Sequence, residues 1–158
     1  MDLKLIYIFI LTILPIIELR VGLPLGISYA IKNNFPIILI FFIVVFLNIL
    51  LIFFIFFFLD YINKFLLRIK IYRKFFVFYL NKFRKKVDKF ETKYNSLGFF
   101  ALVLFVAIPL PGTGAWTGCL VAWVLGLDRT KSIASIALGV IIAGIIILIS
   151  SLGIVALI

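Results

Sequence analysis

Two ionisable side chains with the means to do chemistry lie close together in an apolar stretch. Glu18 and Arg20 are separated by one residue, in a segment long enough to reach into a bilayer. An ion at the bilayer centre costs roughly 2.5 to 3.5 kcal/mol on insertion scales, so such residues are functional-site candidates. Burial favours the neutral form of a carboxylic acid, which suits Glu18 to a proton-coupling role. Arg20 stays charged and can hold a carboxylate or phosphate through two parallel hydrogen bonds.

A second stretch, Pro109 to Gly118, combines prolines, glycines and hydroxyl groups. Pro costs about 3 kcal/mol and Gly about 1 kcal/mol in a helix interior, so we expect one helix to end here and another to begin near Ala115. Free N–H groups at that start would attract a substrate's phosphate or carboxylate, or Glu18 itself. The predicted substrate-binding residues of the two stretches are Arg20, Gly22, Pro24, Pro109, Pro111, Gly112, Thr113, Gly114, Trp116 and Thr117.

Structural roles are the alternative for most polar and aromatic residues of the apolar segments. Glu18 and Arg20 could neutralise each other, or pair across subunits, only to hold the hairpin. A direct pair would require broken backbone, because residues two apart on a helix do not face each other. The other structural roles are aromatic packing or interfacial anchoring for Trp116 and Trp123, bonds to backbone carbonyls for Thr113 and Thr117, core packing for Cys119, and an interhelical hydrogen bond for Asn48.

Two other apolar segments are uninterrupted and long enough to cross a bilayer. Residues 37–59 and 132–158 carry no charge, and the shorter of them would be roughly 35 Å long as a helix. The apolar regions 5–31 and 98–127 are instead split by the two Pro/Gly stretches, Pro15–Gly26 and Pro109–Gly118, into pieces of about 10 to 14 residues, which are too short to span. We expect each to form a re-entrant helical hairpin. A single kinked helix that crosses the bilayer is the alternative.

The segment 60–97 holds 11 of the 16 basic residues. The positive-inside rule therefore places it in the cytoplasm. Its apolar positions recur every three or four residues, which predicts an amphipathic helix on anionic lipid headgroups, or else a coiled-coil seam between subunits. The order hairpin, polar link and long span then occurs twice along the chain, in opposite orientations. This order predicts an inverted repeat whose hairpin tips meet at a midplane binding site.

Composition supports a single all-α integral membrane domain. Hydrophobic residues make up 66% of the 158 residues and the mean hydropathy is +1.34, far above the soluble norm. With no His and one Cys, Cys/His zinc sites and disulfides within the chain are excluded, and we expect no metal or cofactor and no enzymatic activity. Nucleic-acid binding is not expected in so apolar a chain. Its small size suggests a homo-oligomer.

These motifs resemble the small multidrug export protein family of prokaryotic membrane proteins. The resemblance rests on Glu18-Leu-Arg-Val-Gly-Leu-Pro-Leu-Gly-Ile27, on Ile108-Pro-Leu-Pro-Gly-Thr-Gly-Ala-Trp-Thr-Gly118, and on Gly139-Val-Ile-Ile-Ala-Gly144. It covers nearly the whole chain. It implies a multi-pass transporter in the cell membrane of a prokaryote.

That family in turn is similar to the DedA/VTT (SNARE-associated-like) superfamily, whose members carry two facing re-entrant hairpins. They include lipid and polyprenyl-phosphate translocators and lipid scramblases. Those proteins usually carry an Arg in the second hairpin as well, whereas the second apex here is uncharged. We therefore expect a transporter of an anionic or amphipathic small molecule, proton-coupled through Glu18, with a lipid flippase or scramblase as the first alternative and a non-transporting membrane scaffold as the second.

Overall fold

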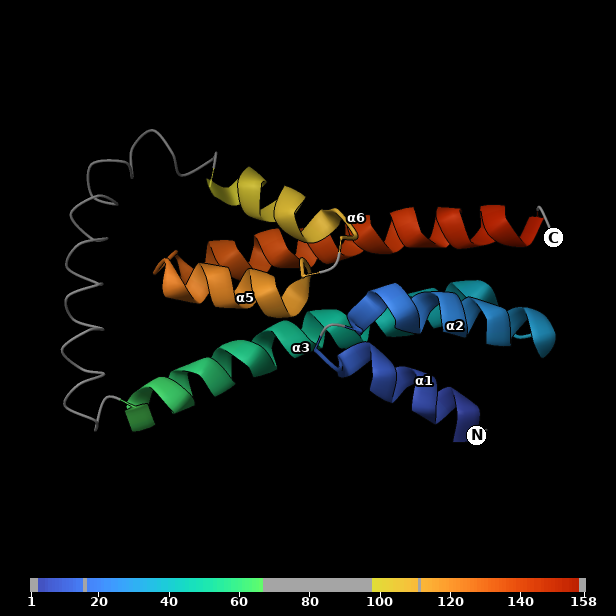
Figure 1. The fold of residues 1–158 in the computed structure, drawn as a ribbon, viewed down its shortest axis with the longest axis horizontal. Helices are drawn as coiled ribbons and strands as arrows, with labels where there is room; N and C mark the ends of the chain where they lie inside the picture. The colour runs from blue at the N-terminus through green and yellow to red at the C-terminus, as the bar shows by residue number, and fades with distance from the viewer. Residues whose placement is uncertain (1–2, 16, 67–97, 111, 157–158) are drawn as a thin grey trace.

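The computed structural model describes residues 3–15, 17–66, 98–110 and 112–156 (Figure 1). Within these ranges the regular structure is entirely α-helical, which confirms the predicted class. The helices are α1 (Leu3–Ile13), α2 (Glu18–Lys32), α3 (Ile37–Leu66), a helix Gly98–Ala107, α5 (Ala115–Val124) and α6 (Arg129–Ala156). Residues 67–97 of the predicted amphipathic helix lie outside the described residues.

Two helices, α3 and α6, are long and apolar enough to cross a membrane. Their segments Ile37–Ile62 and Arg129–Ile154 have 26 residues each, so each is roughly 39 Å long, more than the ~30 Å of a hydrocarbon core. The two helices pack against each other and run in opposite directions (Figure 1). Six phenylalanines of α3 have more than half of their surface exposed, as suits a lipid-facing side: Phe42, Phe46, Phe53, Phe54, Phe57 and Phe65.

Glycines let α6 approach its neighbours closely. A Cβ added at Gly144 would lie 3.1 Å from the side chain of Val45 on α3. A Cβ added at Gly139 would lie 2.9 Å from the carbonyl oxygen of Val103. Small residues are what such close helix contacts require in a membrane. Gly139 and Gly144 therefore serve packing within the molecule.

The remaining helices form two helix-turn-helix pairs. In Figure 1, α1 and α2 extend from the centre of the molecule toward one end, and the helix Gly98–Ala107 (yellow) and α5 extend toward the other. The two turns meet near the middle of the long helices. With 11, 15 and 10 residues, α1, α2 and α5 are about 15 to 23 Å long, too short to cross a bilayer.

The predicted first interruption, Pro15 to Gly26, is wrong in its extent. The chain turns between Ile13 and Glu18, and α2 then continues to Lys32. The interruption of helical structure is therefore confined to the neighbourhood of Pro15.

Tertiary packing explains why α2 continues through residues of low helix propensity. Gly22 lies directly against the Thr12 side chain of α1, and Gly26 lies against Ile40 of α3. Pro24 removes one hydrogen bond from the helix interior. Packing against neighbouring helices commonly outweighs propensity at such positions.

Candidate functional site

The carboxylate of Glu18 lies at the start of α5, where the two turns meet. Its Oε2 accepts a hydrogen bond from the Ala115 N–H at 3.1 Å, and its Oε1 accepts one from the Trp116 N–H at 3.0 Å. The side chain is almost fully buried, with 5% of its surface exposed. The predicted anion-receptive start of α5 is thus present, and Glu18 occupies it.

Backbone geometry on both sides makes this contact possible. Glu18 has a φ of 44°, in the left-handed region that residues other than glycine seldom adopt. Gly114, the residue before α5, has a φ of 131°, and a Cβ there would collide with the Glu18 carboxylate. A residue held in an uncommon conformation costs of the order of 1 to 3 kcal/mol, so the surrounding structure must stabilise it. Such outliers cluster at functional sites.

Arg20 joins the two turns a second time. Its Nη2 donates to the carbonyl oxygen and to the hydroxyl oxygen of Thr113. The Thr113 hydroxyl lies 2.7 Å from the carbonyl oxygen of Ile108 and 2.9 Å from that of Leu110, so it also braces its own turn. Glu18 and Arg20 therefore bond to the opposite turn, and no direct ion pair joins these two residues.

Two further residues of the second stretch make bonds at this junction. The Trp116 indole N–H donates to the carbonyl oxygen of Ile13 at 3.1 Å, which ties α5 to the end of α1. The Thr117 hydroxyl donates to the Gly114 carbonyl oxygen at 3.3 Å, so it satisfies the backbone as its structural alternative predicts. We call Glu18, Arg20, Thr113 and Trp116 with their partners the tip junction.

Not every predicted site residue belongs to the tip junction. Gly22 and Pro24 lie within α2, away from the turn. Pro109 and Gly112 lie in the exposed part of the second turn, and there is open space around Gly112. Pro111 lies outside the described residues. Among the described residues, no cluster of three His, Cys, Asp or Glu side chains could hold a metal ion.

Asn48 is a further polar residue at this site, although the sequence analysis gave it only a structural role. The predicted interhelical hydrogen bond is wrong, because its Nδ2 donates to the Val44 carbonyl oxygen of its own helix at 2.9 Å. The side chain is fully buried and borders a small cavity together with Glu18, Arg20 and Gly114. As the one strongly polar residue in an uncharged span, Asn48 was the signal that could have revealed this role.

A comparison with family models matches residues 18–146 to the family described as "Putative small multi-drug export protein". The chain belongs to this family. The matched region begins at Glu18 and includes the whole tip junction except Ile13. In comparisons with curated proteins and with solved structures, nothing matches the chain. With its two long apolar helices, this member of the small multi-drug export family is a membrane protein.

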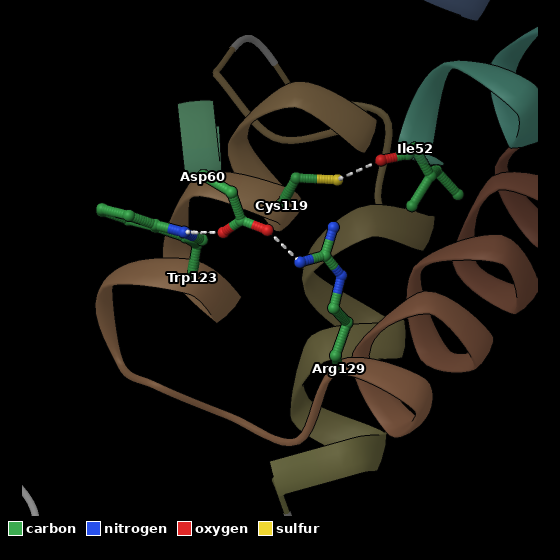
Figure 2. A network of polar contacts seen from close by, with 5 residues as sticks. All are labelled: Ile52, Asp60, Cys119, Trp123 and Arg129. Carbon is green, nitrogen blue, oxygen red and sulfur yellow. Dashed lines mark hydrogen bonds and ion pairs between the residues drawn. The ribbon is translucent and has the colours of Figure 1, made fainter. Parts of the chain in front are cut away.

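A second polar cluster of this export-family protein lies where the ends of α3, α5 and α6 come together (Figure 2). The Asp60 carboxylate accepts a hydrogen bond from the Trp123 indole N–H at 3.0 Å and forms an ion pair with Arg129. The Arg129 guanidinium also lies over the Phe56 ring, 5.0 Å from its centroid. The side chains of Arg129 and Asp60 are 48% and 41% exposed. We call Asp60, Trp123, Arg129 and Phe56 the end cluster.

Cys119 lies beside the end cluster in the core (Figure 2). It is fully buried, and its Sγ lies 4.0 Å from the carbonyl oxygen of Ile52. This position agrees with the expected packing role. Its burial leaves the thiol poorly accessible to reagents.

Proposed function

We propose that this protein is a proton-coupled membrane transporter of anionic or amphipathic small molecules, with the tip junction as its binding site. The observation that carries the proposal is the pair of hydrogen bonds from the Ala115 and Trp116 N–H groups to the Glu18 carboxylate. A helix N-terminus favours negative charge, and here a side chain from the other end of the chain supplies it. A substrate anion can take the same place.

Protonation of Glu18 is the step that makes room for the substrate. The neutral acid loses its charge and one of its acceptor oxygens, so its bonds to the start of α5 weaken. The N–H groups of α5 then become available to a carboxylate, sulfonate or phosphate, and the positive charge of Arg20 attracts that anion. Release of the proton restores the carboxylate, which competes with the bound anion for the same N–H groups.

Alternating access follows if the two helix pairs are re-entrant hairpins of an inverted repeat. Supporting this arrangement, α1, α2 and α5 are too short to span, and the two pairs extend in opposite directions from the tip junction (Figure 1). With residues 60–97 in the cytoplasm, the α1–α2 pair opens to the outside and the second pair to the inside. Rocking of the halves would expose the tip junction to each side in turn.

Flux into or out of liposomes tests the transport proposal. Purified protein is reconstituted with trapped sulforhodamine B, an anionic amphipathic dye, and a proton gradient is imposed. Wild type should move the dye at a rate that follows the gradient. Glu18→Gln, which cannot exchange a proton, should abolish this dependence, and Glu18→Asp should retain part of it. Gradient-driven flux that survives unchanged in Glu18→Gln removes the coupling role.

Cysteine accessibility tests the arrangement in the membrane. In a Cys119→Ala background, single cysteines replace Asn33 and Arg129, and intact cells are treated with a membrane-impermeant maleimide. Re-entrant hairpins predict labelling at position 33 from outside and at 129 only after the membrane is opened. Labelling of position 129 from outside as well would show that the second helix pair crosses the bilayer completely.

A lipid substrate is the second candidate, favoured by an open groove between α1 and α2. The groove has a volume of about 630 Å³, and it is lined by apolar residues with Lys4 and Lys32 at its border. An acyl chain could lie against the apolar lining while a lysine holds the phosphate. Leaflet mixing of a fluorescent phospholipid in the same liposomes, without a proton gradient, would favour a flippase or scramblase over a proton-coupled transporter of small molecules.

A further inference from the structure

A small cavity lies directly behind the tip junction. It is bordered by Glu18 and Arg20 of α2, by Asn48 of α3, by Gly114 and by Ala143 of α6. Its volume is about 10 Å³, close to the roughly 10 to 15 Å³ that one water molecule requires. The cavity therefore has room for one small ligand and no more.

Asn48 uses only part of its hydrogen-bonding capacity. Its Nδ2 donates to the Val44 carbonyl oxygen, but its Oδ1 has no hydrogen-bond partner among the described residues, and the side chain is fully buried. Leaving a buried acceptor unpaired is costly, and natural structures seldom do so. Asn48 Oδ1 therefore needs a hydrogen-bond donor.

The other polar groups of the cavity decide which donor fits. The Glu18 carboxylate accepts one N–H bond at each oxygen and has further lone pairs, so it can accept another bond. Arg20 supplies a guanidinium that can donate to the ligand. Two acceptors and one donor around a space of this size match a water molecule, which needs two to four polar partners.

The geometry points to a bound water molecule that bridges Asn48 Oδ1 and the Glu18 carboxylate and exchanges the proton with Glu18. This inference rests on the proposed coupling role of Glu18. A hydronium ion in the cavity gives one proton to the carboxylate, leaving a neutral acid and a water molecule. In the reverse step the acid returns the proton to the water, and Asn48 Oδ1 accepts a hydrogen bond from the resulting cation. Asn48 thus positions the water without touching the substrate.

Infrared difference spectroscopy between high and low pH tests both parts of the inference. The carboxylic acid C=O band of Glu18, identified by its absence in Glu18→Gln, reports protonation. An O–H band that shifts in ¹⁸O-water and appears with the same pH step reports the bound water. Wild type should show both bands, and Asn48→Leu should keep the Glu18 band and lose the water band.

Flux measurements add a functional readout. Proton-driven dye flux in Asn48→Leu should fall roughly tenfold, the rate equivalent of one lost hydrogen bond. Ser135→Ala, which also deletes a buried polar group but away from the cavity, should leave flux within twofold of wild type. If Asn48→Leu does not fold, Ala143→Val fills the cavity from α6 and keeps Asn48, and it should also remove the water band.

The outcomes separate this inference from the transport proposal. A water band that persists in Asn48→Leu or Ala143→Val, or that is missing from wild type while the Glu18 band is present, overturns the water site. A missing Glu18 band in wild type overturns the coupling role on which the site rests.

Discussion

The tip junction and the end cluster contain the same types of side chain in different surroundings. Each brings together a carboxylate, an arginine and a tryptophan from distant parts of the chain. Glu18 is buried and bonds to backbone N–H groups, whereas the Asp60 and Arg129 side chains are nearly half exposed and bond to each other. Exposed ion pairs contribute about 0 to 1 kcal/mol, but a buried charge without its partners is strongly destabilising. The tip junction should therefore contribute more to stability than the end cluster does, and the proposed function also depends on it.

Removal of the carboxylates should give the largest difference between the two regions. Glu18→Leu leaves two N–H groups at the start of α5 unpaired in the interior, at a cost of about 2 to 5 kcal/mol. Asp60→Leu, the matched control, should cost below about 1 kcal/mol because water can replace its bonds. Thermal unfolding in detergent measures both. Equal destabilisation by the two variants would contradict the distinction between the regions.

The glycines of the second turn should show the next largest effect. Gly114→Ala places a methyl group against the Glu18 carboxylate at a φ of 131°, and we expect a loss of about 3 kcal/mol. Gly112→Ala has a φ of 86° but open space around it, so only the backbone strain of about 1 kcal/mol remains. The same unfolding assay applies. A Gly114→Ala variant as stable as Gly112→Ala would mean that Glu18 does not hold this position.

Replacement of each arginine by lysine compares function in the two regions. Arg20→Lys keeps the charge but loses the planar guanidinium that reaches both Thr113 oxygens, so dye flux should fall about tenfold. Arg129→Lys should change flux by less than about twofold, because an exposed pair contributes little. The liposome assay provides the measurement. Greater sensitivity to the change at Arg129 would place the working site at the end cluster.

Salt should produce the smallest effect. The Debye length falls from about 10 Å at 0.1 M salt to about 3 Å at 1 M, so the small stability difference between wild type and Asp60→Leu should vanish at high salt. The difference caused by Glu18→Leu should persist, because a buried group is screened far less. Unfolding temperatures at the two salt concentrations test this. A salt-sensitive Glu18 effect would indicate that water and ions reach the tip junction freely.

Apolar runs and the positions of proline and glycine predicted much of the fold and part of the site. The two long helices follow from uncharged apolar runs, although α3 extends to Leu66 rather than ending at residue 59. The start of α5 at Ala115 follows from the prolines and glycines before it. In contrast, the uninterrupted helix through Gly22, Pro24 and Gly26 depends on contacts with α1 and α3, which a propensity scale does not contain.

Pairings between distant residues were harder to predict. The prolines and glycines before α5 predicted that its start would bind an anion. The sequence alone did not decide whether that anion is a substrate's phosphate or carboxylate or the Glu18 side chain, which the structure places there. The Arg20–Thr113 contact and the end cluster join residues 63 to 93 positions apart. Such contacts depend on how the helices are placed in space, and a single sequence has no local pattern that records them.

The sequence separation within the tip junction also has a consequence for biosynthesis. Glu18 and Ala115 are 97 residues apart, so the ribosome has still to produce the start of α5 when α1 and α2 are complete. At about 5 to 20 residues per second, roughly 5 to 20 s pass before the carboxylate can meet its partners. During that interval Glu18 lacks the N–H groups of α5 that it later binds. Its neutral, protonated form would then cost less free energy in the lipid than the carboxylate. The proton proposed to drive transport would then also assist insertion of the nascent chain.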